Sequence, residues 1–159
     1  MSRRLVLGLA ACALVAATLD AAPAIAIDEP ANVIKYRQAV MRANGGHLGA
    51  IAGVARGEVS FADEVLGHAH AIAEMSQNME RLFPPGSGKD DTEQKSAALP
   101  AIWERPEEFS AAIANFQEKA ATFLEVAEGA EQATLARELG VLGQQGCGGC
   151  HENFRERQD

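Results

Sequence analysis

Hydrophobic residues recur three, four or seven positions apart through most of the chain, and the sequence has no alternating runs rich in β-branched residues. This spacing predicts α-helices, because such positions share one helical face. We expect a first helix from Pro30 to Arg56, a second from Ser60 to Pro84, a third from Pro106 to Gly129 and a fourth from Glu131 to Arg157. With mostly short breaks between them, the elements predict an all-α, antiparallel up-down-up-down four-helix bundle.

The connection between the second and third helices is the longest, running over "PPGSGKDDTEQKSAALP". Its glycine, proline and charged residues predict a loop. A loop of this length is expected to cover part of the bundle or to cross over it. Trp103 follows shortly after and is expected to anchor the loop on the helices.

Residues 1–26 have a different pattern from the rest. Arg3 and Arg4 precede an apolar run, and the small residues "AIA" end at Ala26. This order is typical of a secretory signal peptide, so we expect cleavage after Ala26 and export to the periplasm. The bundle domain then spans 27–159. The stretch "LAAC" supports an alternative, in which Cys12 ends a bacterial lipoprotein box and carries a lipid anchor.

Charge narrows the range of partners. The chain has 14 basic and 22 acidic residues, and loss of Arg3, Arg4 and Asp20 with the leader leaves 12 and 21, a net charge of about −9. Such a charge disfavours nucleic acid and would steer a partner with a basic face onto the protein.

Cys147, Cys150 and His151 form the motif "CGGCH" near the C-terminus. On a helix these spacings put both thiols and the imidazole on one face. C-x-x-C-H is the attachment motif of c-type haem: each thiol adds to one porphyrin vinyl group, and the histidine ligates iron. We therefore expect one haem c, attached through Cys147 and Cys150 and ligated by His151.

Three other uses of the cysteine pair have less support. A redox dithiol usually accompanies a βαβ pattern, and no strands are predicted here. A zinc site needs a second pair of ligands at matching spacing, which the sequence lacks. A plain disulfide is the third alternative.

Four glycines lie within or just before the motif. In an exposed helix interior each glycine lowers the stability of the helix by about 1 kcal/mol relative to alanine. We interpret Gly143, Gly146, Gly148 and Gly149 as small residues that let the macrocycle approach the backbone. Arg155 lies four residues after His151, so we expect it on the same helical face as the histidine. It is a candidate to shield the histidine or to pair with a haem propionate.

The ending "CGGCHENFR", on the last helix of a predicted four-helix bundle, resembles the class II c-type cytochromes, which comprise cytochrome c′ and its low-spin relatives. The stretches "VIKYRQAVMRANGGHLGAIAGVARGE" and "LFP" resemble the family's first helix and the close of its second. The resemblance implies that Met41 lies over the open haem face and that Arg37 lies near the propionates. It also implies a homodimer through the first two helices.

The role of Met41 decides which of two functions the family resemblance implies. In low-spin members a methionine at this position ligates iron, whereas in cytochrome c′ the residue only packs over a vacant site that admits NO or CO. The segment "MRANGGHLGAIA" resembles the low-spin branch of the family at least as closely as the high-spin branch. We therefore favour a His151/Met41-ligated haem in a periplasmic one-electron carrier. The alternatives are a high-spin, five-coordinate gas-binding protein and a structural haem bundle; none of these is an enzyme.

The remaining histidines and methionines are weaker candidates. His47 lies about 240° around the helix from Met41, so the two cannot face one iron. His68 and His70 are expected on the surface. Met75 and Met79 are expected in the core.

Overall fold

The computed structural model describes residues 28–157. The expected signal peptide and Cys12 lie outside the described residues. Within them, no helix is both long and apolar enough to cross a membrane.

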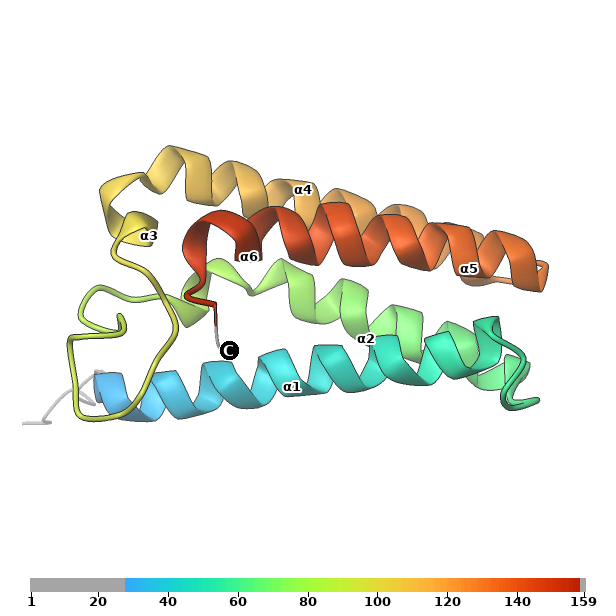
Figure 1. Ribbon diagram of the computed structural model, residues 1–159, viewed down its shortest axis with the longest axis horizontal. Helices are drawn as coiled ribbons and strands as arrows, with labels where there is room; N and C mark the ends of the chain where they lie inside the picture. The colour runs from blue at the N-terminus through green and yellow to red at the C-terminus, as the bar shows by residue number, and fades with distance from the viewer. Residues whose placement is uncertain (1–27, 158–159) are drawn as a thin grey trace, which may run out of the picture.

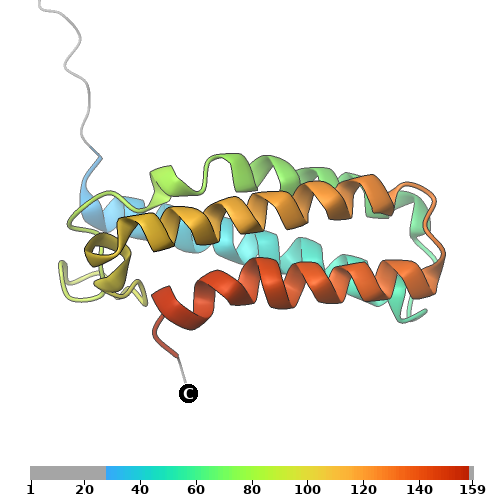
Figure 2. The same ribbon diagram turned by 90° about the horizontal axis from the view of Figure 1, so that it is seen from above.

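The long helical segments alternate in direction (Figures 1 and 2), as the mostly short breaks between them predict. The first three are α1 (Pro30–Ala55), α2 (Val65–Gln77) and α4 (Pro106–Ala127). The fourth is continuous but changes geometry: α5 (Gln132–Val141) leads into the π-helical segment η3 (Leu142–Gly148), and α6 (Gly149–Phe154) completes it. The predicted four-helix bundle is confirmed.

Helix α2 is shorter at both ends than the expected helix. At the start, a 3₁₀ turn, η1 (Ala62–Glu64), precedes α2, and neither element has a side-chain cap. At the other end the hydroxyl of Ser76 donates to the carbonyl oxygen of Ala73 at 2.6 Å. Such local bonds compete with continued helix, and a second 3₁₀ turn, η2 (Glu80–Leu82), follows.

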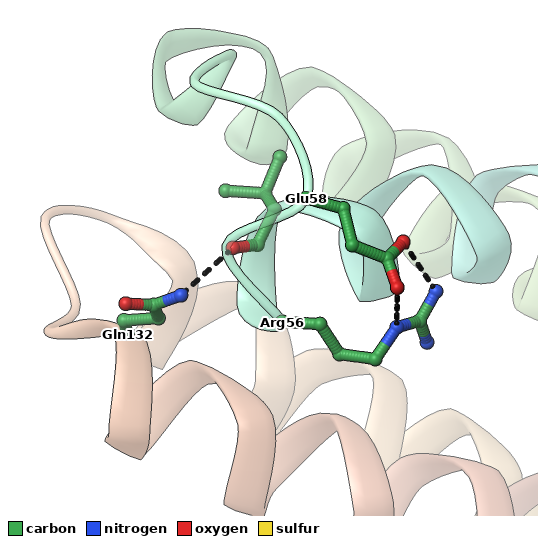
Figure 3. Close-up of polar contacts among 4 residues, drawn as sticks. Arg56, Glu58 and Gln132 are labelled. Atoms are coloured by element: carbon green, nitrogen blue, oxygen red, sulfur yellow. Dashed lines mark hydrogen bonds and ion pairs between the residues drawn. The ribbon is translucent and has the colours of Figure 1, made fainter.

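A tight turn at the end of α1 meets the start of α5 (Figure 3). The Arg56 guanidinium donates two hydrogen bonds to the Glu58 carboxylate, and the Gln132 amide donates to the carbonyl oxygen of Val54 at 3.4 Å. Gly57 has φ +71°, which favours glycine. A Cβ there would also lie 2.8 Å from the Gln132 amide nitrogen.

The core runs along the bundle axis and is filled mainly by α4. Four large apolar residues of α4 are buried: Phe109, Ile113, Phe116 and Phe123. They meet buried aliphatic residues of the other rods, among them Ile51, Ile72, Leu135 and Leu142.

The long segment between η2 and α4 folds across one end of the bundle and includes a short helix, α3 (Ala101–Glu104). It joins the C-terminal segment through two backbone bonds, from Leu99 N–H to Phe154 O (3.1 Å) and from Glu156 N–H to Ala97 O (2.8 Å). The Trp103 indole N–H donates to the Phe83 carbonyl at 3.1 Å, and its side chain packs against the hydrophobic core, which agrees with the expected anchoring role.

Candidate functional site

A cavity of about 670 Å³ opens between α1, α4, the C-terminal helical segment from α5 to α6, and the long segment between η2 and α4. We call this last segment (residues 83–105) the end-closing segment. A cavity of this size is within the range of cofactor sites. Its walls include all six residues singled out from the sequence: Arg37, Met41, Cys147, Cys150, His151 and Arg155. The bundle thus brings together α1 and the C-terminal motif, which are about a hundred positions apart.

The two cysteines and the histidine reach the cavity from a π-to-α junction. Cys147 belongs to η3, while Cys150 and His151 belong to α6. Single-turn π segments often mark functional sites. The Asn115 side-chain amide donates to the Gln145 carbonyl at 2.7 Å and so ties this irregular stretch to α4.

Both thiols are free in the described part of the chain and half-buried. Burial raises the pKa of Cys147, and burial followed by the proximity of Cys147 raises the pKa of Cys150 to about 11. Reactive redox cysteines have lowered pKa values instead, so the site does not resemble a thioredoxin-like dithiol. Burial, and then the charge of Arg155, lowers the pKa of His151, which favours the neutral imidazole that ligates metals.

One of the glycines around the motif, Gly146, has a packing role in addition to the one expected at the cavity. A Cβ on Gly146 would lie 3.2 Å from Leu142 and 3.3 Å from Phe116, so this glycine permits close packing of η3 on α4. Nothing lies within 4 Å of a Cβ on Gly143. Helix–helix contact therefore accounts for Gly146 independently of any cofactor.

Arg37 is only 4% exposed, and its guanidinium is held by the end-closing segment. It donates to the carbonyl oxygens of Leu82 (2.9 Å) and Ser87 (2.7 Å), and to the hydroxyls of Ser87 (2.9 Å) and Ser96 (2.9 Å). It also lies over the Phe83 ring, 4.7 Å from the centroid. Burial lowers its pKa to about 10, which leaves it charged at neutral pH. A propionate contact for Arg37 stays a prediction.

Arg155 lines the cavity, but not as the next turn of a helix. Helix α6 ends at Phe154, so the fourth helix expected to reach Arg157 is three residues shorter. Arg155 has an extended backbone (φ −123°, ψ 131°) because it pairs with Ala98 in an isolated antiparallel bridge. Its contact with a propionate also stays a prediction.

Two methionines reach the cavity. Met41 is half-buried on α1, and Met79, expected only as core, is buried and lines the cavity as well. His47 lies away from the cavity and contacts His68, with 2.9 Å between their Nδ1 atoms. His68 is therefore half-buried and paired rather than a free surface residue.

Sequence reasoning placed several of the residues that line the cavity elsewhere or gave them no role at the site. Phe83, Phe109 and Phe154 form a row with edge-to-face contacts at centroid distances of 5.0 and 5.2 Å. Asn44 is 6% exposed, and neither polar atom of its amide has a hydrogen-bond partner among the described residues. Buried polar groups normally have hydrogen-bond partners. An unpaired amide in the cavity wall is therefore consistent with a cavity that a bound group fills.

A helical bundle with two neutral thiols and a neutral imidazole in one large, mostly apolar cavity defines a haem-binding c-type cytochrome. The sequence of residues 32–155 matches the family model described as Cytochrome C′. The chain belongs to the cytochrome c′ family and binds one haem c through Cys147 and Cys150.

Individual relatives agree with this family assignment. Cytochrome c-554 of Cereibacter sphaeroides strain ATCC 17023 is 36% identical over 88% of this chain and 92% of its own. Cytochrome c′ of Pararhodospirillum photometricum is 30% identical over 80% and 98%. A solved cytochrome c′ with ligand-controlled dimer dissociation superposes with a TM-score of 0.76 and 28% identity, covering 83% of this chain and all of the other.

These similarities support a c-type cytochrome with a single haem. Between the two functions expected from the sequence, they favour the gas-binding alternative over the electron carrier with His151/Met41-ligated haem that we had favoured.

Proposed function

We propose that this protein is a single-haem cytochrome that binds small gases such as NO or CO on the haem face opposite His151, beneath Met41. The observation that carries the proposal is the shared cavity: the attachment cysteines, His151 and Met41 line one space in a chain that matches cytochrome c′ over residues 32–155.

Each residue has a distinct task. The haem supplies an iron that changes by one electron and accepts small ligands. Cys147 and Cys150 hold the macrocycle, and His151 ligates iron as the neutral imidazole that its burial favours. Met41 covers the opposite face and limits access to it. Arg37 fixes the segment that closes this end of the cavity.

The second candidate is an electron carrier in which the Met41 thioether ligates iron. It is favoured by one observation: Met41 lines the cavity and has the chemistry to ligate. Thioether ligation raises the reduction potential. Under this reading no small ligand binds until Met41 leaves the iron.

The visible spectrum of the reduced protein at neutral pH, with and without CO, separates the two. A prompt shift on adding CO supports gas binding beneath Met41. No shift in the wild type, with a shift in Met41→Leu, supports ligation by Met41 and overturns the proposal. Met79→Leu is the matched control, because it removes the other thioether of the cavity wall. It is expected to leave the CO response unchanged.

We further propose export to the periplasm after cleavage at Ala26 and exchange of electrons with redox proteins that present a basic face. Acidic composition supports the second point. Association through α1 and α2 into a homodimer is supported by the dimeric cytochrome c′ relative. Rates of electron exchange that do not fall as salt rises would contradict charge-guided docking.

A further inference from the structure

Two histidines meet between α1 and α2, outside the haem cavity. The Nδ1 atoms of His47 and His68 are 2.9 Å apart, and the rings are tilted by 50° with their centroids 5.1 Å apart. Both side chains are half-buried, so they remain accessible to solvent ions. Burial, and then the proximity of His68, lowers the pKa of His47, which favours its neutral imidazole at neutral pH.

The residues that precede the two histidines are glycines in open surroundings. His47 follows Gly46 and His68 follows Gly67, and nothing lies within 4 Å of a Cβ placed on either glycine. Within residues 28–157 no group of three or more potential metal-ligating side chains gathers. The pair therefore offers two protein nitrogens, with water available for the other coordination positions.

The separation of the nitrogens allows both to reach one ion. With metal–nitrogen bonds of about 2.0 Å, two ligands are about 2.8 to 3.3 Å apart, depending on whether they are cis in a square plane or at a tetrahedral angle. The two Nδ1 atoms, 2.9 Å apart in a hydrogen bond, already lie at a chelating distance, and the nature of the ligands then decides the metal. Square-planar coordination by nitrogen and oxygen is typical of Cu²⁺, which is also the divalent first-row ion that such sites bind most tightly.

We propose that His47 and His68 form a two-histidine binding site for Cu²⁺ that links α1 to α2. In the absence of copper the same two nitrogens share a single hydrogen bond. On binding, the Nδ1 proton of that hydrogen bond moves to Nε2 of the same ring, and both rings turn so that their Nδ1 lone pairs face one ion. The acidic charge of the chain favours cation binding in general, but the site itself is defined by the two imidazoles.

The test is a titration of the ferric, haem-loaded protein with Cu²⁺ buffered by glycine, followed by calorimetry and by electron paramagnetic resonance. The wild type is expected to bind one Cu²⁺ per chain, with hyperfine splitting from two imidazole nitrogens. His47→Gln and His68→Gln are each expected to weaken binding about tenfold or more, because each leaves a single imidazole without its chelating neighbour. His70→Gln is the matched control: His70 is exposed on the same helix but does not belong to the pair.

A second measurement reports the link between the helices. Bound Cu²⁺ stabilises the folded protein by mass action, so the melting temperature is expected to rise with Cu²⁺ in the wild type and in His70→Gln only. Far-ultraviolet circular dichroism and the haem spectrum establish that all variants are folded. The proposal is overturned by a wild type that binds no Cu²⁺, or by either His47→Gln or His68→Gln binding as tightly as the wild type.

Discussion

Replacing Arg37 by alanine tests whether this side chain is primarily a clamp on the segment that closes the haem cavity. Its guanidinium serves four acceptors on Leu82, Ser87 and Ser96, at 2.7 to 2.9 Å. Three of these bonds are buried. Alanine leaves the carbonyl oxygens of Leu82 and Ser87 without this donor in a buried place, while the Ser96 hydroxyl still accepts from the Ala98 N–H.

The expected cost follows from those contacts. Each hydrogen bond to a charged group contributes about 1.5–3 kcal/mol, reduced here because the charge itself loses hydration on burial. We expect a net loss of about 3–5 kcal/mol in the free energy of unfolding, a large part of the 5–15 kcal/mol typical of a domain. Arg37→Lys restores less than half, since an ammonium cannot present donors in the same planar fork.

The assay is urea unfolding, with Gln38→Ala as the matched control. Gln38 is the next residue on α1 and donates a single exposed bond, at 2.8 Å, to the Lys95 carbonyl of the same segment. Its loss is expected to cost about 1 kcal/mol or less. Amide hydrogen exchange at Lys89 and Leu99, whose N–H groups are bonded within this closure, is expected to accelerate in Arg37→Ala.

Measuring the same variants in a Cys147→Ala, Cys150→Ala chain separates the clamp from a role at a propionate. A clamp requires Arg37→Ala to destabilise this haem-free chain as well. A loss confined to the haem-loaded protein, or a loss no larger than that of Gln38→Ala, would refute the reasoning.

Three further changes probe other parts of the bundle. Gly146→Ala is expected to cost about 1 kcal/mol, because crowding against α4 outweighs the helix propensity gained; Gly143→Ala, with open space, is expected to stabilise by up to about 1 kcal/mol, and urea midpoints decide. Asn44→Leu in the cysteine-free chain is expected to raise the free energy of unfolding by about 1–3 kcal/mol, since an unpaired buried amide is removed; an unchanged midpoint contradicts this. Because the pKa of His47 is lowered in the folded state, the unfolded chain binds more protons below about pH 6.5, so stability falls as pH decreases through that range. A His47→Gln, His68→Gln double variant should flatten the pH profile of unfolding, and an equally steep profile would contradict this origin.

The parts of the site that could be predicted from the sequence are those set by local spacing or by the family resemblance. Cys147, Cys150 and His151 lie within five residues, so a single turn of helix suffices to bring them together. The four rods follow equally from hydrophobic periodicity. Met41 and Arg37 came from the resemblance, and the shared cavity is the structural observation that links them to the motif.

What could not be predicted depends on contacts between distant segments. The acceptors of Arg37 lie 45 to 59 positions away along the chain, and only the path of the loop brings them to α1. The end of α6 is set in the same way: Glu156 donates its N–H to Ala97 and Arg155 pairs with Ala98, so the chain leaves the helix although no proline or glycine marks the place.

These two contacts together explain how a cavity persists beneath the C-terminal motif. The segment that Arg37 fixes from α1 is the segment that pairs with the residues after Phe154. Strain or loss at either attachment therefore acts on the same wall. If Arg37→Ala releases the segment, the bridge at Ala98 loses its support, and exchange at the Leu99 amide, which donates to Phe154, accelerates along with that at Lys89. Independent exchange at these two amides would mean that the closure consists of separate parts rather than one cooperative unit.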